Sequence, residues 1–442
     1  MRAAVSESER RAAGMASSPV MWMDAAVFLI GLGSFYHIFF VGEVYPSEIA
    51  LFVLLFMIFG AKHRYLSRQP VPMLIAVFAI WLLGQVGTDL IRHTPIRDMM
   101  RGWAAIIVFF IDFIVVYMLV SEQVRRVYFL IFGYALGWLI APLIQPSPSF
   151  SAEPWKFGFG VPFILMTFAY LGWRHGRALY RLRKYTVLLI FLGLISIFLN
   201  ARSLGAYTIL SSLLIWLRGS RVGERFRWKV SLRRLLFLIA LVFITAFGVK
   251  QLYGYMADHG LLGEHARMKY EMQATGKLGL LIGGRAELIP AVFAVMDSPI
   301  IGHGSWAKDP KYREYLLLLL ELGYQQSEEQ LERGIESSDL IPHHSHILQN
   351  WVWAGILGAL FWAFVLFWVV RIAWHSFRQP NELFAPLVFL SLLSIWDVFF
   401  SPLGSMTRFV WAVKLTVLLV SWRLVRQEQR AARSLRTRWG GA

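Results

Sequence analysis

Long apolar runs recur along this chain, and they constrain its fold more than any other feature. Each run holds about 16–22 residues, which is the length that a helix needs to cross roughly 30 Å of hydrocarbon. Helices and closed barrels are the structures that satisfy every backbone hydrogen bond inside a bilayer. The runs lie near residues 22–41, 46–61, 71–88, 102–120, 127–145, 158–173, 185–200, 203–217, 235–252, 347–370, 383–400 and 407–423. We therefore predict an all-α polytopic membrane protein with about twelve transmembrane helices.

The composition agrees with a membrane protein. Hydrophobic residues make up 57% of the chain and charged residues 16%, whereas soluble domains carry roughly 25% charged residues. Aromatic residues reach 15%, which suits a chain with aromatic rings at two membrane interfaces. The 442 residues include no cysteine. This excludes disulfides, cysteine-ligated metal sites and a thiol nucleophile.

The basic residues set the expected orientation. The formal net charge is +17, which in a soluble protein would suggest nucleic acid. Here most lysines and arginines collect in alternate loops and at both termini, so we expect those parts in the cytoplasm and no nucleic-acid partner. Residues 1–20 lack the order of a signal peptide and are expected to be a disordered cytoplasmic tail. Helices one to nine then occupy 21–250, helices ten to twelve occupy 347–423, and 424–442 form a basic cytoplasmic tail.

One loop differs from the others. Residues 251–346 form a long segment on the outer side, in which acidic side chains outnumber basic ones. Unstructured loops of this length are uncommon in compact proteins and are usually functional. Leu280–Met296 and Tyr312–Tyr324 are apolar but short or broken by charge. We expect amphipathic helices that lie at the outer interface or fold over the bundle.

The strongest cluster of polar residues ends this loop, where His343, His344 and His346 fall within four residues. Neutral imidazole accepts a proton near pH 7, so one interpretation is a general base. A metal site is a second interpretation, although no HExxH motif or acidic cluster supplies further ligands. A polar cap on the tenth span is the third. The chain also lacks a Walker motif and an acidic pair for a divalent ion, so an enzyme built on it would work without a metal, a nucleotide or another cofactor.

Two further features contain arginine. The stretch GGRAE at 283–287 is followed by SPIIGHGSW at 298–306. Glycines let backbone N–H groups approach an anion, and arginine offers a planar fork of donors to phosphate oxygens. A turn that ends an amphipathic helix explains the glycines equally well. Arg202, in the tight connection between spans seven and eight, either contacts phosphate or extends toward lipid headgroups.

Several charged residues fall inside predicted spans. Asp397 and Lys414 on the last two spans are expected to pair as a structural ion pair, and Asp112 is a possible proton carrier in a transporter.

The histidine cluster resembles a family signature. His344–Ser345, followed after nine residues by GILG at 355–358, resembles the signature of bacterial O-antigen ligases and related polymerases. The family more often has asparagine where this chain has Ser345. Arg285 and the turn at 298–304 resemble the arginine and the proline–glycine turn of that family's periplasmic loop. Arg202 resembles an arginine at the outer end of a middle helix, and the plan of about twelve spans with one large periplasmic loop is also similar.

The resemblance implies glycosyl transfer at the periplasmic side of the bacterial inner membrane. The donor would be a glycan on undecaprenyl diphosphate, and the acceptor a sugar hydroxyl of lipid A-core in a ligase or of another lipid-linked glycan in a polymerase. His344 would be the base in a single displacement that inverts the anomeric centre, and Arg285 and Arg202 would stabilise the departing diphosphate. The neighbouring residues expected to bind substrate are His343, His346, Gly284, Gly302, Gly304 and Ser305.

Two alternatives belong to other classes. A polytopic transporter or lipid-linked glycan flippase would use Asp112 or the Asp397–Lys414 pair. A membrane scaffold would use the long loop to bind a partner without any chemistry. The one-sided loop and the outer histidines and arginines favour the enzyme.

Overall fold

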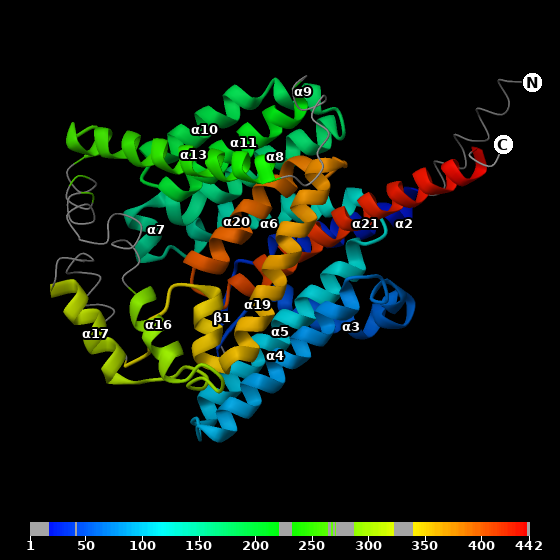
Figure 1. Ribbon diagram of the computed structural model, residues 1–442. Coiled ribbons are helices and arrows are strands. Elements are labelled where there is room, and N and C mark those ends of the chain that lie inside the picture. Colours follow the sequence, from blue (N-terminus) through cyan, green and yellow to red (C-terminus); the bar gives the residue numbers. More distant parts are fainter. Residues whose placement is uncertain are drawn as a thin grey trace, which may run out of the picture.

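The computed structural model of the chain describes residues 17–39, 42–220, 232–263, 267, 270, 287–321 and 339–439. Within these residues the fold is a bundle of helices with one short antiparallel hairpin (Figure 1). The hairpin strands are β1 (Ile38–Phe39) and β2 (Glu43–Val44). The helices are α2 (Ser17–Leu32), α3 (Pro46–Lys62), η1 (His63–Tyr65), α4 (Val71–Ile91), α5 (Ile96–Val120), α6 (Val124–Ile144), α7 (Pro148–Ala152), η2 (Trp155–Phe159), α8 (Gly160–His175), α9 (Leu179–Arg183), α10 (Thr186–Phe198), α11 (Arg202–Gly219), α13 (Leu232–Asp258), α16 (Leu288–Asp297), α17 (Pro310–Glu321), α19 (His346–Arg378), α20 (Phe384–Phe400) and α21 (Thr407–Trp439).

The all-α class predicted from the apolar runs is confirmed, and a helix lies in each of the twelve predicted spans. Six segments are long and apolar enough to cross a membrane: 46–65, 71–91, 96–120, 124–144, 155–175 and 346–378. The described helices 21–32, 186–198 and 384–400 are apolar but shorter. The chain is therefore a multi-pass membrane protein by length and composition, and the count of twelve crossings stays a prediction.

The first span is shorter than the sequence suggested. The apolar run reaches residue 41, but α2 ends at Leu32. The Ser34 hydroxyl donates to the Gly31 carbonyl at 2.6 Å and so satisfies one of the last free acceptors of the helix. The chain then turns into the hairpin, in which Ile38 pairs with Val44. Hydrophobicity alone could not separate this strand from the helix before it, because both are apolar.

The basic C-terminal tail is helical through Trp439. Residues 424–442 follow the last apolar run, and α21 continues without a break into them. The segment is rich in arginine and glutamine, which are good helix formers. The helix therefore leaves the bundle as a long basic extension, which Figure 1 shows near the C-terminus.

Glycines allow two pairs of neighbouring helices to pack closely. A Cβ atom on Gly133 of α6 would lie 2.0 Å from the Phe28 carbonyl oxygen of α2, and one on Gly205 of α11 would lie 2.6 Å from the Gly193 carbonyl oxygen of α10. Small residues at such contacts are typical of helix pairs in membranes, where close backbone packing replaces the hydrophobic effect. The helices on either side of residues 199–201, α10 and α11, therefore form a closely packed hairpin.

Loops that the charge pattern assigns to one side contact each other. At one end of the bundle Arg218 donates to the Phe377 carbonyl at 2.8 Å, and Arg177 pairs with Glu428 at 2.5 Å. At the other end Ser305 donates to Asp89. These contacts join loops and helix ends of like predicted side, and the predicted alternation is therefore consistent with the packing.

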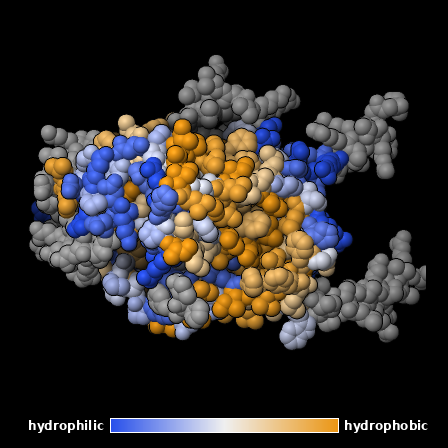
Figure 2. All heavy atoms as spheres, turned by 90° about the horizontal axis from the view of Figure 1, so that it is seen from below, coloured by the Kyte–Doolittle hydropathy of each residue, from blue (hydrophilic) through white to orange (hydrophobic). Residues whose placement is uncertain are grey.

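The surface has the pattern expected for a bilayer protein. Figure 2 shows an apolar zone in the middle of the visible face, with hydrophilic surface toward both ends. The hydrophilic left end in this view is the end of Figure 1 that carries α16 and α17. Large apolar side chains are exposed on helices of the apolar zone, among them Phe56, Met57 and Leu83. Lipid tails would cover such side chains in a membrane.

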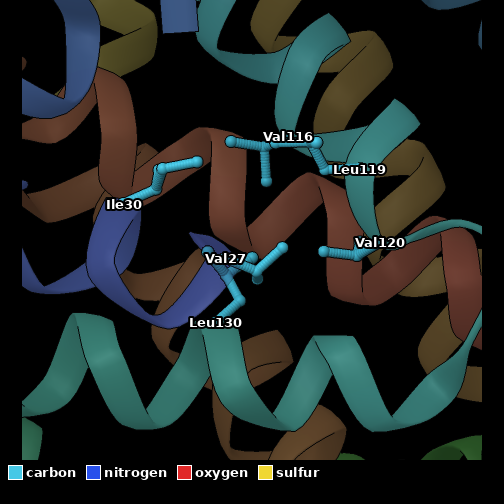
Figure 3. A pocket seen from close by; sticks show the side chains of 6 residues that line it. All are labelled: Val27, Ile30, Val116, Leu119, Val120 and Leu130. Atoms are coloured by element: carbon cyan, nitrogen blue, oxygen red, sulfur yellow. The ribbon is translucent and has the colours of Figure 1, made fainter. Parts of the chain in front are cut away.

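A small pocket between α2, α5 and α6 is visible in Figure 3. It is lined by Val27, Ile30, Val116, Leu119, Val120 and Leu130. All six side chains are aliphatic, so this pocket offers no group for chemistry or for binding a polar ligand.

Candidate active site

The three histidines at the end of the long loop lie directly before or at the start of α19. Ser345 caps this helix: its hydroxyl oxygen accepts a hydrogen bond from the Leu348 backbone N–H at 3.4 Å. The same hydroxyl donates to the Val398 carbonyl of α20 at 2.9 Å. The serine that follows His344 therefore fixes this turn against a second helix, and the three imidazoles have fixed and different surroundings.

His346 is part of the protein interior. Its Nδ1 is 2.6 Å from the Ser401 carbonyl oxygen, so Nδ1 carries the proton and donates. The ring contacts Trp362 and Trp411 at centroid distances of 4.9 and 5.6 Å, and the residue is 1% exposed. A substrate could not reach this ring without opening the bundle. His346 therefore connects α19 to the end of α20.

His343 lies against the side of α19. Its ring meets the Trp353 indole edge-on at a centroid distance of 5.5 Å. Burial lowers the pKa of His343 to about 4, although its own backbone and the Glu287 carboxylate act in the raising direction. At neutral pH the ring is therefore uncharged and a weak base. A general base works best with a pKa near the working pH, so His343 is poorly suited to that role.

His344 has the surroundings that a base needs. Its Nδ1 lies 2.9 Å from Glu287 Oε2, and the two side chains are 29% and 24% exposed. A carboxylate on Nδ1 holds the proton on that nitrogen and leaves Nε2 as the acceptor. Among the three histidines, His344 combines partial exposure with an orienting carboxylate.

Glu287 is a site residue that sequence reasoning missed. It closes the GGRAE stretch and directly precedes α16. Its position two residues after Arg285 was the only available signal, and a sequence does not show which histidine it meets. Arg285 and Gly284 themselves lie outside the described residues. The pair nevertheless brings the end of this stretch to the histidine segment.

The turn at 298–306 is held by the ends of α4 and α19. Asp89 Oδ1 accepts from the Ser305 backbone N–H at 2.6 Å, and Asp89 Oδ2 accepts from the Ser305 hydroxyl at 2.7 Å. Arg92 donates to the Gly302 carbonyl at 2.8 Å. Gly302 and Gly304 have φ angles of 83° and 96°, which favour glycine. The contacts described for Gly302, Gly304 and Ser305 are thus contacts within the protein, and they fix the turn beside the histidine segment.

Arg202 begins α11 at the same end of the bundle. Its guanidinium lies 4.4 Å from the centroid of the Tyr253 ring, and the Tyr253 hydroxyl donates to the Asn200 side chain at 3.2 Å. Farther along α11, Tyr207 contacts Trp396 on α20, and α20 ends beside His346. The contact described for Arg202 is with Tyr253 and not with the histidine segment.

Two charged sites lie in the helices themselves. Lys414 donates to Asp397, and Ser401 donates to the other oxygen of that carboxylate at 2.7 Å. The predicted ion pair between the last two helices is therefore confirmed. Asp112 on α5 is fully buried, and among the described residues neither of its carboxylate oxygens has a hydrogen-bond partner.

The geometry defines a helical membrane protein with an oriented, partly exposed imidazole at one end of the bundle. Among the described residues, no three histidine or acidic side chains gather as a metal site requires. Comparisons with protein-family models, with curated proteins and with solved structures find no match for this chain.

Proposed function

We propose that the chain is a glycosyltransferase of the O-antigen ligase or polymerase type in a bacterial inner membrane. Its donor is a glycan on undecaprenyl diphosphate, and its acceptor is a sugar hydroxyl of lipid A-core or of another lipid-linked glycan. The active site lies on the periplasmic side, at the end of the bundle that carries the histidine segment. Both termini lie in the cytoplasm.

The contact between His344 and Glu287 carries this proposal. A sugar hydroxyl is a poor nucleophile, and a positioned base accelerates its attack by about 10²–10⁴-fold. The 2.9 Å contact gives His344 a fixed tautomer with Nε2 free to accept. It also joins the histidine segment to the GGRAE stretch, which supplies the arginine expected at the diphosphate. A base and an anion site are the two groups that this reaction needs.

The transfer is one displacement. The acceptor oxygen attacks the anomeric carbon of the donor sugar while its proton passes to His344 Nε2. The bond between the anomeric carbon and the diphosphate oxygen breaks, and undecaprenyl diphosphate leaves with the electron pair. The configuration of the anomeric centre is inverted. In this step the chain's own residues take the proton and stabilise the leaving group, and no metal is required.

Arg285 and Arg202 are the proposed partners of the diphosphate. Negative charge builds on the leaving group, and guanidinium groups stabilise it through charge-assisted hydrogen bonds. Arg285 lies two residues from Glu287 in the sequence. Arg202 lies at the end of the bundle where α20 meets His346. Replacing either arginine with alanine should weaken binding of the lipid diphosphate.

The test is glycan transfer by the purified chain. Protein in detergent is incubated, without metal, with undecaprenyl-diphosphate-linked glycan and with each acceptor, and the products are separated on a gel. A ladder identifies a polymerase, and a shift of lipid A-core identifies a ligase. His344→Ala should abolish transfer and leave donor binding nearly unchanged.

A matched control uses His259, an exposed histidine just after α13. His259→Ala should keep full transfer activity. Transfer that persists in His344→Ala, in His343→Ala and in His346→Ala would show that no histidine of the segment is the base.

Asp112 supports one other candidate function. A buried carboxyl group without a partner is costly in a membrane and is typical of proton pathways. A transporter or lipid-linked glycan flippase would use it to couple proton movement to transport. In sealed vesicles Asp112→Asn should then stop flux, and vesicles with the parent protein that show no flux would exclude this function.

A further inference from the structure

A group of basic residues lies around one tryptophan at the end of the bundle that lies away from the histidine segment. Arg371, His375 and Arg378 lie in the last turns of α19, and Arg426 lies on α21. Arg371, His375 and Arg426 contact Trp422 of α21. Together with Arg378, whose charge acts on His375, we call these residues the Trp422 cluster. It takes no part in the glycosyl transfer proposed above.

The rings and the cations of the cluster are in direct contact. The guanidinium carbons of Arg371 and Arg426 lie 5.7 and 5.3 Å from the centroid of the Trp422 ring. The His375 ring meets the same indole edge-on at 5.1 Å. Trp368 contacts Trp422 at 5.5 Å and lies 5.4 Å from the Arg371 guanidinium. The two indoles therefore hold both arginines at one place on the surface.

The positive charge of the cluster has no acidic partner among the described residues. None of Arg371, Arg378 and Arg426 makes an ion pair there, and the charges of all three act on His375. The acids nearest in sequence are already engaged, because Glu428 and Glu382 lie 2.5 and 3.6 Å from Arg177. Like charges at this spacing repel each other, so binding of an anion lowers the free energy of the site.

The place of the cluster in the molecule indicates the kind of anion. Arg371 and Arg378 lie near the end of a helix that is long and apolar enough to cross a membrane. Tryptophan and arginine together are typical of the headgroup level of a bilayer. The cluster thus offers guanidinium donors at the depth of lipid phosphates.

We propose that the Trp422 cluster binds the phosphate of an anionic phospholipid. The two guanidiniums donate to the phosphate oxygens, and the acyl chains lie against the apolar side chains next to it, such as the exposed Phe367. Free phosphate offers the same oxygens without the chains. The acyl chains add apolar contact that only the lipid makes, so the site prefers the lipid.

The test is lipid retention by the full-length protein in native mass spectrometry. The protein in detergent is titrated with phosphatidylglycerol, with phosphatidylcholine and with inorganic phosphate. We expect one tightly held phosphatidylglycerol, and weaker retention of phosphatidylcholine and of phosphate. Arg371→Gln/Arg426→Gln should weaken retention of phosphatidylglycerol about 10-fold or more. Both arginines are exposed, so this variant should fold.

Two further variants make the result decisive. Arg64→Gln/Arg181→Gln removes the same charge from two exposed arginines that stack on tyrosines elsewhere, 5.3 and 5.6 Å from the ring centroids. This variant should keep the tightly held lipid. Arg371→Lys/Arg426→Lys keeps the charge and should keep most of the binding. Equal loss in both glutamine variants, or displacement of the lipid by inorganic phosphate at equal concentration, would overturn the proposal.

Discussion

Three histidines that are close in sequence have three different environments. His346 is enclosed by tryptophans and donates to a carbonyl, His343 is held uncharged against Trp353, and His344 is partly exposed beside a carboxylate. The low pKa of His343 and the burial of His346 therefore distinguish them from His344, which the sequence could not do. At this scale the proposed function depends on a single contact, between His344 and Glu287.

The contact predicts a graded effect of Glu287→Gln. The amide keeps the shape of the side chain but can present its N–H₂ group to Nδ1, so the tautomer of His344 is no longer fixed. The transfer rate should fall about 10- to 100-fold, which is less than the loss expected for His344→Ala. Donor binding should stay within about twofold. A rate equal to that of the parent protein would contradict the orienting role, and steady-state kinetics with the lipid-linked donor measures it.

The low pKa of His343 predicts a pH-dependent stability. The group binds a proton near pH 6.5 in the unfolded chain and near pH 4 in the folded protein, so the unfolded state holds more protons between these values. Stability should therefore fall as the pH drops from 6.5 to 4. His343→Gln should remove up to about 3 kcal/mol of this dependence. Thermal melts across this pH range test it, with His259→Gln as the exposed control. Identical pH slopes in the parent and in His343→Gln would contradict it.

Among the elements, the broken helix α19 organises the candidate site. Gly355 has φ 61° and ψ −154° inside α19, a conformation that is open almost only to glycine. The turn at 298–306 fits into this break: the Ile356 N–H donates to the Ile300 carbonyl, and the His303 N–H donates to the Val352 carbonyl. One helix therefore presents the histidines at its start and holds the glycine turn further along.

The break predicts that Gly355→Ala is strongly destabilising. A Cβ atom at this position would lie 2.0 Å from the Ile300 carbonyl oxygen, and the backbone angles are strained for alanine. We expect a loss of at least about 2 kcal/mol. Gly87→Ala is the control, because among the described residues no atom beyond its own stretch of helix lies within 4 Å of the added Cβ. Melting of the two variants in detergent measures the difference, and equal melting temperatures would refute the role of the break.

For the whole molecule, the predicted orientation depends on which loops and helix ends lie together at each end of the bundle. Ion pairs and hydrogen bonds join loops to helix ends of the same predicted side, such as Arg177 with Glu428 at one end and Ser305 with Asp89 at the other. Figure 2 shows the apolar zone between two hydrophilic ends. A bundle of this kind separates a headgroup-level cation cluster at one end from an oriented base at the other.

The predicted orientation can be tested because the chain contains no cysteine. A single cysteine then reports its own side by reaction with a membrane-impermeant maleimide. Lys308, between α16 and α17, and Arg181, in α9, are both exposed. Figure 1 shows α9 at the opposite end of the bundle from α16 and α17. Lys308→Cys should react in spheroplasts, whereas Arg181→Cys should react only in inverted vesicles. Reaction of both from the same side would show that the predicted topology is wrong.

The all-α membrane class and the helix in each predicted span could be read from the sequence. Both follow from apolar length and backbone hydrogen bonding, which are local properties. The pairing of Asp397 with Lys414 was also predictable, because opposite charges inside a bundle stabilise each other. The end of α2 at Leu32 and the extension of α21 to Trp439 were not, since hydropathy does not mark where an apolar segment leaves a helix.

Only the tertiary structure decided which histidine can act. The carboxylate that contacts His344 belongs to Glu287, which is far from it in sequence. Their contact depends on how α16 and α19 pack. The same packing buries His346 and lowers the basicity of His343. The exposure of an imidazole and the nitrogen that carries its proton depend on the folded surroundings. Residues distant along the chain create those surroundings.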